Sequence, residues 1–312
     1  MKRVLVPIGL FLAAGCGAAL AQSGSGEGQL VERLYGPLAP LVWAIAAVLT
    51  QLGMIALVAA PFQMLFPGVR REPKIRSYEF WLDILYHCQV LWLTPLAFFL
   101  AVDWLVDTVY RDEHPWWAAL AGLPYWAQVA IAVWAFDFLV YWRHRWEHEL
   151  APLWSFHAVH HTAEKIDFLT TTRLHPFEIA LGALFNAAVV KLGISTSAAA
   201  VGFAIYLYYN YFIHTNVRIR FPGLLKYVLV SPFMHQWHHA KDAVAAGKNL
   251  GVIFAWNDWL FRTAHHPDDW PTEFGLAAPE PERVGQSYVR QVLYPLQFLL
   301  ARVAAWRQAR PA

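Results

Sequence analysis

Long runs without a charged residue set the strongest limit on how this chain can fold. Three of them cover residues 41–66, 84–102 and 115–136, and each is long enough to cross a bilayer as an α-helix. The composition agrees, because 58% of the 312 residues are hydrophobic, only 15% are charged and the mean hydropathy is +0.35. Such a chain is too apolar for a soluble globular protein of this size. The sequence therefore predicts an all-α integral membrane protein.

Two further apolar segments extend the predicted helical bundle. Residues 177–191 and 197–213 are predicted as a pair of helices joined by a short loop. The uncharged stretch between Glu178 and Lys191 is short for a full crossing, so a complete span and a partly re-entrant hairpin both stay open. The bundle should therefore contain about 4-5 transmembrane helices. Residues 288–310 carry apolar side chains at helical spacing, which predicts a helix in the membrane interface, kinked at Pro295.

The first residues resemble a secretory leader. A basic start is followed by an apolar stretch over residues 4–20 and by the sequence Ala19-Leu20-Ala21, a pattern typical of a signal peptide cleaved after residue 21. Two alternatives stay open, namely a lipoprotein cleavage site before Cys16 and an uncleaved anchor. The pattern favours cleavage, which leaves residues 22–136 as the N-terminal membrane helices.

Basic residues predict the orientation of the bundle. The segment 70–76 contains four lysines and arginines, whereas the segment 111–116 contains one. Because basic loops stay in the cytoplasm, the segment 70–76 is expected there, and counting spans forward places residues 144–161 on the same side. An exported leader requires the same topology. We therefore expect a protein of a bacterial inner membrane whose histidine-rich part faces the cytoplasm.

Two simple counts exclude other classes of function. The net charge of +2 is too small to suggest a nucleic-acid partner. The two cysteines, Cys16 and Cys88, offer neither a disulfide framework nor a paired thiol motif. Redox chemistry in this chain would therefore need a bound cofactor.

Histidines at helical spacing are the main functional signal. Eight of the fourteen fall into three clusters, with spacings i, i+4 in the first and i, i+3, i+4 in the other two. Such spacing gathers the imidazoles of each cluster on one helix face, where they can converge on a metal ion. The clusters are His144 and His148; His157, His160 and His161; and His235, His238 and His239.

The remaining histidines carry weaker signals. His175 opens the segment 177–191, and His214 closes the segment 197–213. A histidine at a helix end is more often an interfacial residue than a ligand, so sequence spacing alone does not decide these two. The other four are isolated or adjacent in pairs that point apart, and we do not expect them to bind metal: His87, His114, His265 and His266.

The number of histidines predicts more than one metal ion. A structural zinc site closes with four ligands and a catalytic one uses three, so eight to ten imidazoles are better explained by two ions with four or five each. Imidazole-rich iron with open positions is suited to oxygen activation. A site at the cytoplasmic surface of a bilayer is well placed to meet a lipid chain or ring.

These residues resemble the fatty acid hydroxylase and sterol desaturase superfamily of integral membrane di-iron oxygenases. The resemblance covers residues 137–263. Its motifs are Asp137…Tyr141-Trp142-Arg143-His144…His148, Leu153-Trp154…His157…His160-His161, Arg173…His175-Pro176…Glu178, His214…Asn216, His235…His238-His239, Asn249-Leu250-Gly251 and Trp256…Asp258…Leu260-Phe261…Thr263. One departure is visible: the family often has Trp-Asp-x-Leu-Phe-Gly-Thr, whereas this chain has an offset Asp258 and Arg262 before Thr263.

The resemblance implies a helical membrane domain with a cytoplasmic histidine-rich cap that holds two irons. These would use O2 to hydroxylate or desaturate a lipid, with electrons from NAD(P)H delivered by a ferredoxin, or by a cytochrome with its reductase. It makes residues 137–263 the catalytic domain and 264–312 a C-terminal tail, and it adds His175 and His214 to the expected ligands. The side chains expected to support the ligands are Asp137, Glu178, Asn210, Asn216, Asp242 and Asn249.

Position gives Asp137 a role of its own. It lies two helical turns before His144 on one face and could accept a hydrogen bond from that ring. A helix-end charge at the membrane interface is the plainer alternative.

Two other functions compete with a lipid oxygenase. A membrane metal carrier or sensor would bind and release an ion without chemistry, but a carrier should place ligands along a path through the spans, and here the clusters lie outside the apolar runs. A structural membrane protein with a retained zinc pair is the third. The sequence does not name the lipid, and sterol, fatty acyl, sphingoid, carotenoid and ether lipids all stay open.

Overall fold

The computed structural model describes residues 77–108, 115–277 and 283–308, together with scattered positions between 53 and 74. The leader and most of the predicted span 41–66 lie outside the described residues. Within them the chain is helical, and its only β pairing consists of two isolated bridges, Leu229 with Phe254 and Ala240 with Phe274. The predicted all-α class is thus confirmed for the part of the chain that the structure describes.

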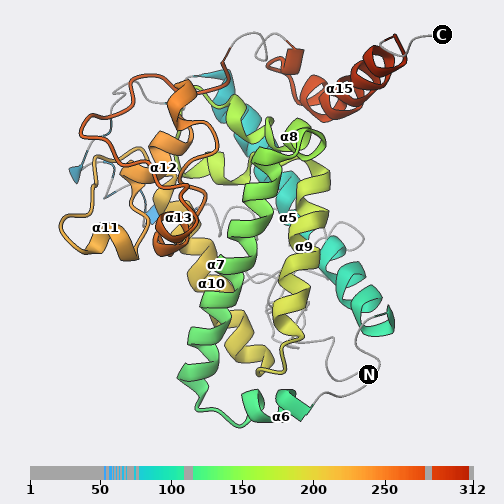
Figure 1. Cartoon of the computed structure of the whole chain (residues 1–312), viewed down its shortest axis with the longest axis vertical. Helices are drawn as coiled ribbons and strands as arrows, with labels where there is room; N and C mark the ends of the chain where they lie inside the picture. The colour runs from blue at the N-terminus through green and yellow to red at the C-terminus, as the bar shows by residue number, and fades with distance from the viewer. Residues whose placement is uncertain are drawn as a thin grey trace, which may run out of the picture.

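Four long helices lie along the long axis of the molecule (Figure 1): α5 (Tyr78–Thr108), α7 (Tyr125–Glu149), α9 (Pro176–Val190) and α10 (Thr196–Ile213). The short α6 (Pro115–Ala121) closes one end. Shorter elements gather at the other end: α8 (Ala151–His157), η3 (His160–Thr162), η4 (Phe168–Thr172), α11 (Leu225–Val228), α12 (Pro232–His238), η5 (Ala243–Ala245) and α13 (Trp256–Leu260). The last helix, α15 (Tyr288–Gln308), projects from that end.

The membrane prediction is supported in part. Among the described residues one helix is long and apolar enough to cross a bilayer, over Tyr78–Trp104 within α5, and it contains the predicted run 84–102. The pair 177–191 and 197–213 corresponds to α9 and α10. The number of spans stays a prediction, and so does the placement of α15 at the membrane surface.

The predicted run 115–136 is not one helix. It is divided by a turn between α6 and α7, and α7 then continues without a break to Glu149. The side-chain amide of Gln128 stabilises this turn by donating to the carbonyls of Ala121 and Leu123, at 3.1 and 2.8 Å. Its carbonyl accepts from the backbone N–H of Ser195 at 2.7 Å. The turn is thereby tied to the start of α10.

Close packing of α7 against α10 forms the centre of the core. Gly202 of α10 permits this approach, because a Cβ there would lie 2.5 Å from the Cβ of Ala132. Phe136 and Val140 extend the same buried face toward the histidine end of α7. Since a protein interior cannot absorb such an overlap, the small residues fix how near the two helices lie.

A buried charge network ties α5 to the segment between α8 and α9. Arg173 is fully buried; its Nε donates to Asp83 at 2.6 Å and its Nη2 to Glu79 at 3.3 Å. Its Nη1 donates to the Thr162 hydroxyl at 3.1 Å, and Lys74 pairs with Asp83 as well. Buried charges are retained only when they are paired and hydrogen-bonded. This network therefore holds the segment that carries His160 and His161.

Candidate metal centre

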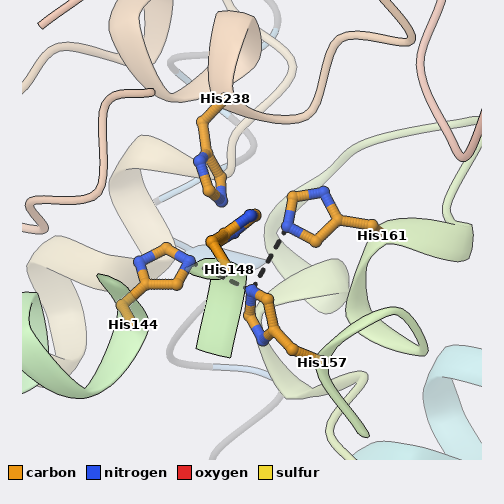
Figure 2. Close-up of side chains that lie close together, drawn as sticks. All are labelled: His144, His148, His157, His161 and His238. Atoms are coloured by element: carbon orange, nitrogen blue, oxygen red, sulfur yellow. Dashed lines mark hydrogen bonds between the residues drawn. The ribbon is translucent and has the colours of Figure 1, made fainter. Parts of the chain in front are cut away.

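Five imidazoles converge at the end of the bundle (Figure 2). His144 and His148 come from α7, His157 ends α8, His161 lies in η3 and His238 ends α12. Their candidate ligand atoms all lie within 4.8 Å of one another. The Nε2 atom of His157 is 3.0 Å from that of His144 and 3.2 Å from that of His161. We call these residues the five-histidine group.

Four more imidazoles form a second group beside the first. They are His160 of η3, His214 at the end of α10, and His235 and His239 of α12 and its C-cap. The Nε2 atom of His214 lies 3.3 Å from that of His160, 2.9 Å from that of His235 and 3.4 Å from that of His239. All four residues are buried. We call these residues the four-histidine group.

The two triplets are shared between the groups. In each triplet the residues at i and i+4 belong to one group and the residue at i+3 belongs to the other. His157 and His161 are in the five-histidine group, whereas His160 is in the four-histidine group. His235 and His239 are in the four-histidine group, whereas His238 is in the five-histidine group. Residues at i+4 and i+3 of a helix lie about 40° and 60° to opposite sides of residue i. The rings of His161 and His239 are consequently only 4.6 Å apart, centroid to centroid, so the two groups are neighbours.

The distances and the protonation state both suit metal ions. Nitrogens that bind one ion at about 2.1 Å lie about 3.0 to 3.4 Å from each other, and the closest Nε2 pairs of the two groups lie 2.9 to 3.4 Å apart. Burial lowers the pKa of His238 to about 4 and that of His214 to about 3. Burial, with neighbouring imidazoles, pushes the pKa of the other seven well below 6.5. The rings are therefore neutral near pH 7, as a metal ligand must be.

Unused ring nitrogens point to the same conclusion. The Nε2 atoms of His148 and His238 are buried and have no hydrogen-bond partner among the described residues, although they belong to a cluster of converging rings (Figure 2). Buried polar atoms normally have partners, and an exception calls for an explanation such as an ion. The donor set thus fits two metal ions.

In four of the nine rings the Nδ1 atom donates a hydrogen bond to an oxygen acceptor. The Nδ1 atoms of His144 and His238 donate to the carbonyls of Leu250 and Lys248, at 2.9 and 2.8 Å. His157 donates through Nδ1 to the Glu178 carboxylate at 2.8 Å. His214 donates to the carbonyl of Asn210, in its own helix, at 2.8 Å. A proton on Nδ1 leaves the Nε2 lone pair free for a metal.

The residues expected to support the ligands differ in whether they contact a ring. Glu178 contacts His157 as expected of a supporting residue, and its other oxygen accepts from the backbone N–H of His175 at 3.0 Å. Asn210 acts through its backbone carbonyl. Asp242 is exposed and caps η5 by accepting from Val244.

The other three bind other parts of the chain. Asn216 donates its backbone N–H to Gln63. Asn249 binds the carbonyls of Met234 and His265 through its side chain. Asp137 accepts from the backbone of Ile253 and Phe254, at 2.6 and 3.3 Å, and not from His144. A separation of seven residues is about 10 Å along a helix, too far for an aspartate side chain to bridge.

His175 lies outside both groups. It is the N-cap of α9, where its Nδ1 accepts from the backbone N–H of Phe177 at 3.0 Å. Its Nε2 pairs with the carbonyl of Val292 at 3.1 Å. Because both nitrogens are engaged, this ring has no lone pair to offer an ion.

The histidines not expected to bind metal also lie outside the groups, as far as they are described. His87 is fully buried in α5, and His265 and His266 follow α13. His114 lies outside the described residues.

Several residues that contact the groups were not identified from the sequence. Glu147 is buried, 3.8 Å from Nδ1 of His157 and 3.3 Å from the Arg143 guanidinium. Its position one turn after Arg143, among the histidines of the first motif, was the available signal. The carbonyls of Lys248 and Leu250 left no signal, because every residue has one.

The segment 257–263, where the chain departs from the family pattern, is held by hydrogen bonds to Asp258. Asp258 accepts from the backbone N–H groups of Leu250 and Gly251, at 2.8 and 2.9 Å, and from the Thr263 hydroxyl at 2.7 Å. Arg262 adopts φ of 61°, a left-handed conformation that glycine takes more easily. The arginine therefore occupies a position where the family pattern has glycine.

These features define a class: a helical protein with two adjacent groups of buried imidazoles able to hold metal ions. Comparison with known families is consistent with it, because residues 129–263 match the family model for fatty acid hydroxylases. The match supports the superfamily that the motifs of this region indicated. No solved structure shows a significant match.

Curated relatives come from animals, bacteria and plants. The chain is 31% identical to human alkylglycerol monooxygenase over 196 residues, which is 61% of this chain and 42% of the relative. It is 29% identical to the ornithine lipid hydroxylase OlsE of Rhizobium tropici, over 54% of this chain and 50% of the relative. It is 26% identical to a very-long-chain aldehyde decarbonylase of rice, over 43% and 22%. The chain thus spans half or less of these relatives.

Proposed function

We propose that this protein is a membrane-bound di-iron oxygenase that hydroxylates or desaturates a lipid. The observation that carries the proposal is the convergence of nine neutral imidazoles in two adjacent groups, inside a region that matches fatty acid hydroxylases. The relatives named as a monooxygenase and a hydroxylase favour hydroxylation. An alkylglycerol or an ornithine lipid is the kind of substrate that their names suggest.

The proposed ligands are the nine histidines of the two groups. Bound iron would supply activation of O2 for the oxidation of a C–H bond. The chain itself keeps the rings neutral by burial, and it fixes the Nε2 atoms of four of them through the acceptors of Nδ1. The two groups contribute no negative charge, and Glu147 and Glu178 are the buried carboxylates next to His157.

An external electron donor is part of the proposal. Hydroxylation puts one oxygen atom into the substrate and releases the other as water, which consumes two electrons and two protons. The sequence has no glycine-rich nucleotide motif and no His-Pro-Gly-Gly haem motif. We therefore infer a separate ferredoxin, or a cytochrome with its reductase, that docks on the cytoplasmic face. Turnover by the pure protein with only NADPH and O2 would contradict this.

The proposal also includes the membrane location of the histidine groups. We place the protein in a bacterial inner membrane with the histidines on the cytoplasmic face and residues 137–263 as the catalytic domain. Reporter tags inserted after Arg71 and after Ala312 should report the cytoplasm, and one at Asp112 the outside. A tag at residue 71 on the side opposite to the histidine groups would overturn this topology.

Metal analysis combined with turnover tests the function. Protein purified from iron-replete cells should contain close to two irons per chain, and with a reductase system and O2 it should oxidise an added alkylglycerol or ornithine lipid. A lipid extract of the native cell is the broader substrate test. Readily exchanged metal without turnover would instead indicate a carrier or sensor. Retained zinc without turnover would indicate a structural pair.

A further inference from the structure

One short segment supports two imidazoles of the same group. The carbonyl of Lys248 accepts from Nδ1 of His238 at 2.8 Å, and that of Leu250 accepts from Nδ1 of His144 at 2.9 Å. Between them Asn249 has φ of 54°, a left-handed conformation that asparagine tolerates better than most residues. His238 and His144 come from different helices, α12 and α7. The segment 248–250 therefore links two ligands that no single helix could hold together.

A buried carboxylate fixes that segment. Asp258 is 0% exposed, and it accepts from the N–H groups of Leu250 and Gly251 at 2.8 and 2.9 Å. These two peptide groups flank the carbonyl of Leu250, so the carboxylate determines where that carbonyl points. Hydrogen bonds from peptide N–H groups to a carboxylate are among the strong ones.

A chain of hydroxyls connects the carboxylate back to α7. Thr263 donates its hydroxyl hydrogen to Asp258 at 2.7 Å, so the Tyr141 hydroxyl, 2.9 Å away, must donate to Thr263. The carbonyl of Thr263 accepts from the N–H of Asn249 at 2.9 Å. Tyr141 lies one turn before His144. This chain of hydrogen bonds thus begins at Tyr141 of α7 and ends at His144 of the same helix.

We propose that Asp258 is a positioning residue for the metal ion of the five-histidine group, acting through the segment 248–250. Among the described residues the contacts of that segment with imidazoles are made by His144 and His238, both of the five-histidine group. The four-histidine group is held differently, since His214 donates to Asn210 within its own helix. Loss of the carboxylate charge should therefore weaken one ion and leave the other.

The inference rests on the proposed two-metal function, and its test separates the two. Metal-free full-length protein in detergent is titrated with Fe²⁺ under anaerobic conditions, and bound iron is counted. The wild type should take up two equivalents; if it binds none, the proposed function itself fails. In Asp258→Asn one equivalent should bind as before and the other about 10- to 100-fold more weakly, the usual cost of losing a partner of a ligand.

Double variants assign the weakened ion. Combined with His238→Ala, Asp258→Asn should cause no further loss, because both changes act on the five-histidine group. Combined with His235→Ala, it should leave no tightly bound iron. Asp167→Asn is the control, since Asp167 is a half-buried carboxylate that accepts from Leu169 and Lys74; it should keep both affinities.

Milder variants cover the case in which Asp258→Asn does not fold. Tyr141→Phe and Thr263→Val remove one hydroxyl each from the chain that ends on Asp258, and they should weaken the same ion by a smaller factor. Wild-type affinity for both equivalents in every folded variant would overturn the inference. Equal weakening of both ions would overturn it too, because that is the result of general destabilisation.

Discussion

The two histidine groups lie side by side but are assembled in different ways. The five-histidine group draws on α7, α8, η3 and α12, and two of its rings donate to the segment 248–250, more than 100 residues from His144 in sequence. In the four-histidine group the ring of His214 instead donates to the carbonyl of Asn210, one turn earlier in the same helix. Distant tertiary contacts therefore support two rings of the first group, whereas the support of His214 in the second group is local.

Removing a ligand from each group gives the largest expected effect. His160→Ala and His238→Ala should each lower activity by about 100-fold or more and reduce bound iron from two equivalents to one, because neighbouring imidazoles cannot close the gap. The ion that is lost should differ, since His160 belongs to the four-histidine group and His238 to the five-histidine group. Iron counting and lipid turnover on both variants provide the check.

The control for this experiment has to be chosen from the structure. His266→Ala should keep both ions and most of the activity, since His266 contacts Phe233 and Arg220 rather than either group. His87 is unsuitable, because it is fully buried in α5 and its removal would open a cavity. Full turnover by His160→Ala would show that the groups are not a joint site.

Acid should destabilise the metal-free protein through both groups. The folded-state pKa is lowered to about 4 for His238 and to about 3 for His214. Below pH about 6.5 the unfolded chain therefore takes up protons that the folded chain resists. The contribution of these histidines to stability should be complete above about pH 6.5 and fall steadily as the pH decreases toward 4. Thermal unfolding of metal-free protein between pH 4 and 8 measures this.

Single variants sharpen the pH experiment. Metal-free His238→Ala and His214→Ala should each show a shallower loss of stability than the wild type, because one buried imidazole no longer resists protonation. The same pH dependence of the melting temperature in the wild type and in both variants would mean that these rings are not buried as the structure shows.

The carboxylate behind His157 tests the five-histidine group more gently. Glu178→Gln should lower the affinity of one iron about 10- to 100-fold, because an amide cannot accept at both ends from His157 and from the backbone of His175. The second iron should bind as in the wild type. Glu149→Gln is the control, since Glu149 is exposed and pairs with Arg145. Weakening of both ions would remove the distinction between the groups.

Sequence periodicity predicted the parts of this protein that depend on local chain geometry. The run 84–102 and the pair 177–191 and 197–213 all lie in helices, because an uncharged run and helical spacing are properties of a single segment. The eight clustered histidines also lie in the two groups for this reason. The division of each triplet between groups was not predictable, since it depends on which rings approach from the other helices.

Tertiary contacts decided what the sequence left open. His175 and His214 both stand at helix ends, yet only the ring of His214 reaches a group, because that of His175 caps α9 and meets Val292 of α15. The sequence left Asp137 either as a partner of His144 or as a helix-end charge, whereas it binds the loop at Ile253. Backbone acceptors such as the carbonyl of Leu250 have no sequence signal at all.

The smallest effect is expected at His175, which the family resemblance added to the ligands and the structure places outside both groups. His175→Ala removes the cap that accepts from the N–H of Phe177 and should cost about 1 kcal/mol of stability. His175→Asn supplies another capping side chain and should recover most of that loss. Both variants should keep two irons, because neither ring nitrogen of His175 is free to bind an ion. Thermal unfolding and iron counting on the two variants provide the measurement. Loss of an ion from His175→Ala alone would mean that a tenth imidazole supports the site. The comparison of the five-histidine group with the four-histidine group would then have to include His175.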